Sequence, residues 1–114
     1  MKARKTNPPF LNGVPELLIL KLLSRKEMYG YEIVKEIQLA TGEILSFGEG
    51  SVYPILHTLE KNGFLSGERK VVGGRSRLYY TLTKSGLNKL EEMSQTWEKT
   101  AKGVGLALGG AYGS

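Results

Sequence analysis

The chain has 114 residues, enough for one domain with a modest core and too few for two ordinary domains. Its formal net charge of +5 permits an anionic partner such as nucleic acid without requiring one. Because it has no cysteine and one histidine, disulfides, thiol catalysis, thiolate metal sites and histidine clusters within one chain are excluded.

The first 25 residues predict an arm followed by a helix. Residues 1–13 hold three basic residues and two prolines without apolar periodicity, which predicts a flexible N-terminal arm. Residues 14–25 predict a helix with Pro15 in its first turn and leucines, among them Leu17 and Leu18, around most of its circumference. Such a helix needs burial on more than one side, which indicates a second chain. Its apolar run is too short to span a bilayer, so we expect a cytoplasmic protein with no membrane partner.

Two further helices follow. Residues 29–41 place Ile33, Ile37 and Ala40 on one face, and Gly42 is a plausible stop. Residues 48–63, "GEGSVYPILHTLEKNG", predict a third helix with Pro54 near its start and Gly63 after its end. The spacing of its apolar residues directs four of them inward: Val52, Ile55, Leu56 and Leu59.

The segments "FLSGERKVV" and "RSRLYYTLT" predict a β-hairpin around Gly73-Gly74. Paired glycines accept the positive φ angles that two-residue hairpin turns need. Alternation then separates two faces of the second strand, with Leu78, Tyr80 and Leu82 on one face and Arg77, Tyr79 and Thr81 on the other. Thr83 or Ser85 can cap a fourth helix from residue 84 to about 102.

The last helix has apolar positions separated alternately by three and four residues, as in a heptad seam. The seam consists of Leu87, Leu90, Ser94, Trp97, Ala101, Val104 and Leu108. Packing on its own domain is one explanation, and we favour pairing with a second chain. We therefore assign residues 84–108 to a dimerisation helix and 109–114 to a flexible tail.

Three helices followed by a hairpin predict an α+β, mainly helical fold, a winged helix-turn-helix over residues 14–83. In this fold the third helix enters the DNA major groove and the hairpin, or wing, lies beside it. Residues 61–77 hold five cations against the single carboxylate Glu68, a net charge of +4 within the chain's +5. This concentration of charge on the two DNA-facing elements favours double-stranded DNA as the partner.

The segments "YGYEIVKEI", "GSVYPILHTLEKNGFL" and "GGRSRLYYTLTKSG" resemble the PadR family of bacterial transcriptional regulators. The single C-terminal helix with a lone tryptophan is similar to the small subfamily that includes multidrug-binding repressors. The resemblance implies a homodimer that represses a nearby promoter. Ser76 departs from the family, because many members have proline there.

Spacing, charge and resemblance together give the candidate residues. Those expected to contact DNA are Tyr29, Tyr31, Lys35, Ser51, Tyr53, Pro54, His57, Thr58, Lys61, Lys70, Arg75 and Arg77. Those expected in the dimer interface are Leu17, Leu18, Leu87, Leu90, Ser94, Trp97, Ala101 and Val104. The resemblance also implies that a planar aromatic or cationic effector binds near Trp97, with Met93, Ser94 and Ala101 around it.

Simpler explanations stand beside several of these assignments. His57 can be an inert surface residue, Arg75 and Arg77 can belong to a solvated hairpin, and Trp97 can simply fill a dimer core. The absence of nucleophile motifs, phosphate-binding loops and metal-ligand spacing argues against an enzyme and against a cofactor. The alternative to an operator-binding repressor is a winged-helix module that binds protein or RNA.

Overall fold

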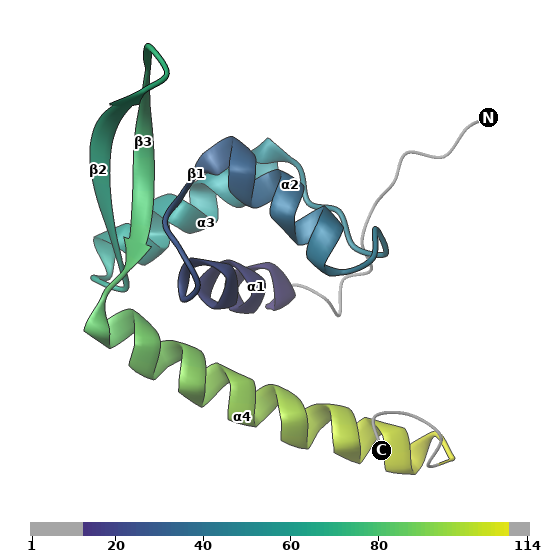
Figure 1. The fold of residues 1–114 in the computed structure, drawn as a ribbon. Helices are drawn as coiled ribbons and strands as arrows, with labels where there is room; N and C mark the ends of the chain where they lie inside the picture. The colour runs from purple at the N-terminus through teal and green to yellow at the C-terminus, as the bar shows by residue number, and fades with distance from the viewer. Residues whose placement is uncertain (1–12, 110–114) are drawn as a thin grey trace, which may run out of the picture.

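The computed structural model describes residues 13–109, so the predicted arm and tail lie outside the described residues except for Gly13 and Gly109. The elements follow the order α1 (Val14–Leu23), β1 (Met28–Tyr29), α2 (Gly30–Ala40), α3 (Glu49–Lys61), β2 (Leu65–Val72), β3 (Arg75–Leu82) and α4 (Lys84–Ala107) (Figure 1). The predicted α+β winged helix-turn-helix with a long C-terminal helix is confirmed.

The three helices α1, α2 and α3 enclose the core. Their fully buried apolar residues come from the faces that periodicity predicted, and removing this apolar surface from water stabilises the head. They are Ile19 and Leu20 on α1, Ile33 and Ile37 on α2, and Val52, Leu56 and Leu59 on α3. Ile55 is only partly buried and packs at the edge of this cluster.

The hairpin belongs to a three-stranded antiparallel sheet in the order β1-β3-β2. Gly73 and Gly74 have φ angles of 60° and 79°, so they form the predicted two-residue turn and pair Val72 with Arg75. This register places Tyr80 and Leu65 in the core, and the predicted alternation of faces is confirmed. The rest of the hairpin projects from the helices as a wing (Figure 1).

The predicted bounds of the first two helices, 14–25 and 29–41, were wrong at three ends, one of which is the end of α2 at Ala40. Helix α1 ends at Leu23, because the Ser24 hydroxyl donates to the Lys21 carbonyl at 2.6 Å and terminates the turn. Helix α2 begins at Gly30, because Tyr29 is extended and belongs to β1, where it pairs with Tyr79 of β3. A two-residue strand has too few positions to leave a periodic signal in the sequence.

Helix α4 is clamped to the head at its start. The Thr83 side chain caps the helix by accepting from the Gly86 N–H at 3.0 Å. The Thr83 hydroxyl also donates to the Gly63 carbonyl at 2.7 Å, and the Thr83 N–H donates to the Phe64 carbonyl at 3.1 Å. The helix continues past residue 102 to Ala107 and runs beneath α1 away from the wing (Figure 1).

Within residues 13–109, no helix combines the length and apolar character needed to cross a bilayer.

Candidate nucleic-acid interface

An open groove of about 430 Å³ lies between α3, the start of α2 and the wing. Most of the side chains around it are aromatic or cationic. Its lining consists of Tyr29, Gly30, Tyr31, Tyr53, His57, Arg69, Ser76, Arg77, Leu78 and Tyr80. Five predicted DNA-contacting residues therefore come together here from four separate elements, β1, α2, α3 and β3.

The outer surface of α3 is exposed as the helical spacing predicted. Solvent reaches five candidate residues there, namely Ser51, Pro54, His57, Thr58 and Lys61. Helix α3 also begins earlier than Pro54 suggested, since this proline lies inside the helix. The exposed groups are hydroxyl, imidazole and ammonium groups, which can reach both base edges and phosphates.

Tyr53 is held differently from the other candidates on α3. It is partly buried against Gly30 at the start of α2, and a Cβ atom at position 30 would approach the Tyr53 Cε1 atom to 2.0 Å. Burial raises the pKa of the Tyr53 phenol, and the nearby Glu49 carboxylate raises it further. The phenol is therefore a neutral hydrogen-bond donor at physiological pH, seated in a notch that only glycine leaves open.

On the outer face of the wing, polar and aromatic side chains contact one another in a row. The Lys70 ammonium lies 2.7 Å from both carboxylate oxygens of Glu27, in the one side-chain ion pair found within residues 13–109. Its hydrogen bond to Glu27 raises the pKa of Lys70. The Arg77 guanidinium lies 4.3 Å from the centre of the Tyr29 ring. Lys70 is thus already engaged by a carboxylate of its own chain, and its contact with DNA stays a prediction.

Two further candidates lie outside the groove. Lys35 is exposed on α2, where its ammonium is 5.8 Å from the centre of the Tyr31 ring. Arg75 is exposed beside the turn at the tip of the wing. Both positions leave the cation accessible to a phosphate backbone.

Arg69 lines the groove although it was not among the candidate residues. In the register of the hairpin it pairs with Leu78, on the face turned towards the core. The paired glycines fix this register from the sequence, so counting outward from the turn could have found Arg69. The exposed cations around the groove and wing therefore include Lys61, Arg69 and Arg75, with Arg77 partly buried.

A second groove, of about 460 Å³, lies between α1 and α4. Leu17 from α1 and Met93 and Trp97 from α4 line it, together with Gly13, Val14, Lys89, Glu92, Thr96 and Thr100. The structure therefore brings two of the four predicted effector residues to one groove. Ser94 and Ala101 are partly buried on α4 but do not line it.

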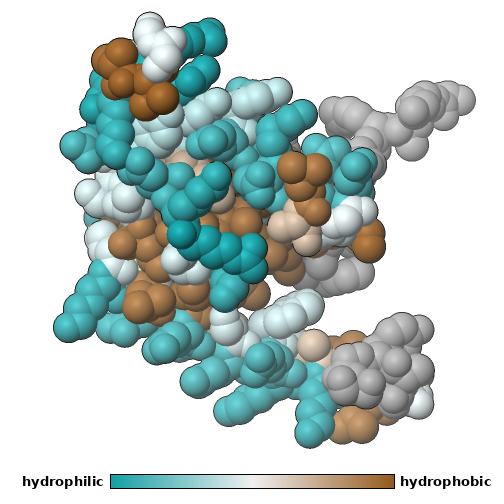
Figure 2. All heavy atoms as spheres, viewed as in Figure 1, coloured by the Kyte–Doolittle hydropathy of each residue, from teal (hydrophilic) through white to brown (hydrophobic). Residues whose placement is uncertain are grey.

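The seam on α4 is divided between the core of this chain and the solvent. Leu90 is 6% exposed and packs in the core, so little of its surface is left for the partner that the spacing predicted. Leu87, Trp97 and Val104 are 47%, 48% and 52% exposed. Leu17, Leu18, Ser94 and Ala101 are partly buried. In Figure 2, apolar surface follows the boundary between the head and α4, whereas the outer side of α4 is hydrophilic except near its C-terminal end.

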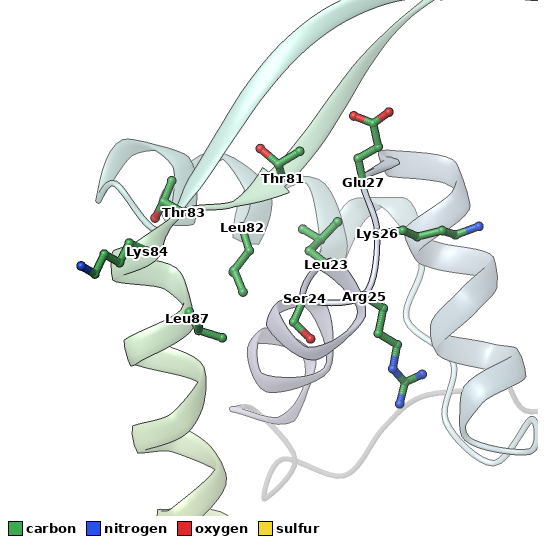
Figure 3. A pocket seen from close by; sticks show the side chains of 10 residues that line it. All are labelled: Leu23, Ser24, Arg25, Lys26, Glu27, Thr81, Leu82, Thr83, Lys84 and Leu87. Atoms are coloured by element: carbon green, nitrogen blue, oxygen red, sulfur yellow. The ribbon is translucent and has the colours of Figure 1, made fainter.

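A third hollow, of about 390 Å³, lies where the turn after α1 faces the start of α4. Leu82 and Leu87 reach into it, and the ends of Arg25, Lys26 and Lys84 point away from its centre (Figure 3). Its cations therefore do not converge on a shared ligand position. We assign the candidate interface to the groove beside α3 instead.

Comparison with known proteins relates this geometry to regulators of transcription. The sequence model of the transcriptional regulator PadR-like family matches residues 19–92, from α1 into the first half of α4. The transcriptional regulator Rv3488 of Mycobacterium tuberculosis is 33% identical over 101 residues, which cover 89% of this chain and 89% of that protein.

Solved structures show the same similarity. A PadR-like transcriptional regulator from Bacillus cereus matches with a TM-score of 0.78 and 34% identity, covering 90% of this chain and 98% of that chain. Bacillus subtilis PadR, crystallised in complex with operator DNA, matches with a TM-score of 0.64 and 31% identity. That match covers 70% of this chain and 46% of the Bacillus subtilis chain.

Proposed function

Because the chain belongs to the PadR-like family of transcriptional regulators, we propose that it binds operator DNA as a homodimer and represses a nearby promoter. Proteins of this family regulate transcription, so the chain is a regulator and not an enzyme. The observation that carries the proposal is the groove between α3 and the wing, where His57, Arg69 and Arg77 converge. Since the chromosome is the target, we place the protein in the cytoplasm.

Helix α3 enters the major groove in this proposal, with its exposed residues against base edges. His57, Thr58 and Lys61 supply donors and a methyl group for that purpose. The wing then follows the neighbouring backbone, where Arg75 neutralises phosphate charge. The operator complex of Bacillus subtilis PadR supports DNA as the partner, because the two chains share 31% identity over the matched region.

The exposed part of the seam on α4 supports the proposal of a homodimer. Leu87, Trp97 and Val104 leave large apolar side chains half in solvent, and a second α4 would cover them. A twofold dimer presents two α3 helices about 34–36 Å apart, which is one turn of DNA. Because twofold symmetry relates the two heads, the operator is pseudo-palindromic.

A DNase I protection experiment tests the proposal on the DNA immediately upstream of the protein's own gene. We expect two protected half-sites of related sequence whose centres lie about one helical turn apart. A single protected half-site would contradict the dimer. Uniform protection at every sequence would contradict operator recognition.

The groove between α1 and α4 is the effector site in this proposal. A planar aromatic cation would stack on Trp97 in this groove. If the dimer samples two distances between its DNA-binding heads, the ligand would favour the distance at which it binds more tightly. A coupling of about 1–3 kcal/mol corresponds to a roughly 5–150-fold loss of operator affinity.

Trp97→Ala should abolish the release of operator DNA by such ligands. In the absence of ligand, its affinity for operator DNA should stay close to that of the original protein. The reason is that alanine removes the stacking surface but leaves α3 and the wing intact. An anisotropy titration of operator DNA with a planar dye cation would also report binding of the dye to the DNA itself. Isothermal titration calorimetry of the ligand with the protein in the absence of DNA is therefore the direct measurement, because Trp97 is the one tryptophan of the sequence and its variants have no tryptophan fluorescence. Trp97→Phe, which keeps an aromatic ring, is the matched control. Ligand binding retained by Trp97→Ala would contradict the assignment.

A further inference from the structure

The outer face of the wing contains a continuous stack of side chains that begins at Glu27, before β1, and ends at Arg77 in the groove. Arg77 lies over the Tyr29 ring at 4.3 Å, and the Tyr29 and Tyr79 rings meet in a T-shaped arrangement at a centroid distance of 5.4 Å. Lys70 lies 5.7 Å from the centre of Tyr79, and Glu27 holds Lys70 from the other side. Every member of the stack therefore has a partner within the chain.

Tyr29 is fixed independently of Arg77. Its backbone N–H donates to the Glu32 carboxylate at 3.2 Å, and β1 pairs it with Tyr79 on the central strand β3. The ring thus extends from a rigid junction between the sheet and α2. Arg77 is on the wing, so its contact with Tyr29 ties the wing to the junction from which α2 begins.

The stack leaves the hydrogen-bonding rim of Arg77 available. A guanidinium on an aromatic ring uses its flat face, whereas its N–H donors lie in the plane and point outward. Arg77 and Tyr29 both line the groove that His57 and Tyr53 of α3 also line. An arginine held in one orientation loses less conformational entropy when it binds than one that is free in solvent.

We propose that Tyr29 is a positioning residue. The face of its ring holds the Arg77 guanidinium in the orientation in which Arg77 contacts operator DNA. The proposal rests on the proposed function, since it concerns the same interface. It replaces the expectation that Tyr29 contacts DNA itself, which would use its phenol oxygen. The two roles differ in what they require from the side chain, because stacking needs an aromatic ring and direct contact needs the hydroxyl.

Four variants separate the two roles: Tyr29→Phe, Tyr29→Leu, Arg77→Ala and the double variant Tyr29→Leu, Arg77→Ala. Fluorescence anisotropy measures their affinity for the duplex upstream of the gene and for a scrambled duplex. We expect Tyr29→Leu to weaken selective binding by about three- to tenfold, in line with a desolvated cation–π contact. Tyr29→Phe should keep an affinity within about twofold of that of the original protein, because phenylalanine retains the aromatic ring.

The double variant tests whether Tyr29 acts through Arg77. If it does, Tyr29→Leu costs no further affinity once Arg77 is absent. Tyr29→Leu should also keep the salt slope of the original protein, because the charge of Arg77 is still present, whereas Arg77→Ala should lower the slope by about one. A general loss of folding would instead weaken the double variant further, and thermal melting of each variant measures that loss separately.

Three results would overturn the positioning role while leaving operator recognition in place. They are a loss for Tyr29→Phe equal to that for Tyr29→Leu, additive losses in the double variant, and no effect of Arg77→Ala. If the original protein binds both duplexes equally, the proposed function fails and the positioning role fails with it.

Discussion

Gly86→Ala is expected to destabilise the protein by about 1–3 kcal/mol, since the new Cβ atom overpacks a closed junction. That atom would lie 2.1 Å from the Phe64 carbonyl oxygen and 2.6 Å from the Leu82 Cδ1 atom. The Phe64 oxygen is a backbone atom that also accepts from the Thr83 N–H, so it cannot move without breaking the clamp. Thermal unfolding should show a melting temperature lower by several degrees.

The matched control is Gly103→Ala, the same substitution in the same helix. A Cβ atom at Gly103 meets nothing within 4 Å, and alanine is a better helix former than glycine. We expect it to stabilise α4 by about 0.5–1 kcal/mol. Equal melting temperatures for the two variants would show that the junction at Gly86 tolerates a side chain, contrary to the packing described above.

Removing Arg75 and Arg77 together should lower operator affinity by about two orders of magnitude, because each arginine contact is worth about 1–3 kcal/mol. The double variant Arg75→Ala, Arg77→Ala should also reduce the slope of log affinity against log salt by nearly two. The reason is that binding of the variant releases about one counterion fewer for each phosphate contact that it has lost. Anisotropy titrations of the upstream duplex at several salt concentrations measure both quantities.

The charge-matched control for this experiment is the double variant Lys99→Ala, Lys102→Ala. Both lysines are exposed on α4, which runs away from the wing, so the variant loses the same charge far from the proposed interface. We expect its affinity and salt slope to stay close to those of the original protein. Equal losses for the two double variants would mean that net charge, and not the wing, governs binding.

Much of the fold could be predicted from the sequence because its signals are local. Apolar residues such as Ile33 and Ile37 recur at helical spacing, and Gly73-Gly74 determines both the turn and the register of the hairpin. The register in turn places Arg77 and Tyr79 on the face opposite Tyr80. Each of these inferences needs only neighbouring residues.

The remaining features depend on contacts between distant residues. Glu27 and Lys70 are 43 residues apart in the chain, so no local pattern indicates that this lysine is paired. The seam spacing correctly identified the apolar stripe of α4, but it could not tell that Leu90 packs in the core of the same chain while Trp97 is half-exposed. Long-range packing decides how a stripe is divided between a core and a partner.

In the proposed function, α3 and the wing recognise a specific duplex. The most direct test is fluorescence anisotropy of the labelled DNA immediately upstream of the gene, compared with a scrambled duplex at several salt concentrations. We expect tight, selective binding that weakens by about three orders of magnitude or more between about 50 and 200 mM salt. Equal, weak binding to both duplexes with a shallow salt slope would contradict operator recognition and favour a module that binds protein or RNA.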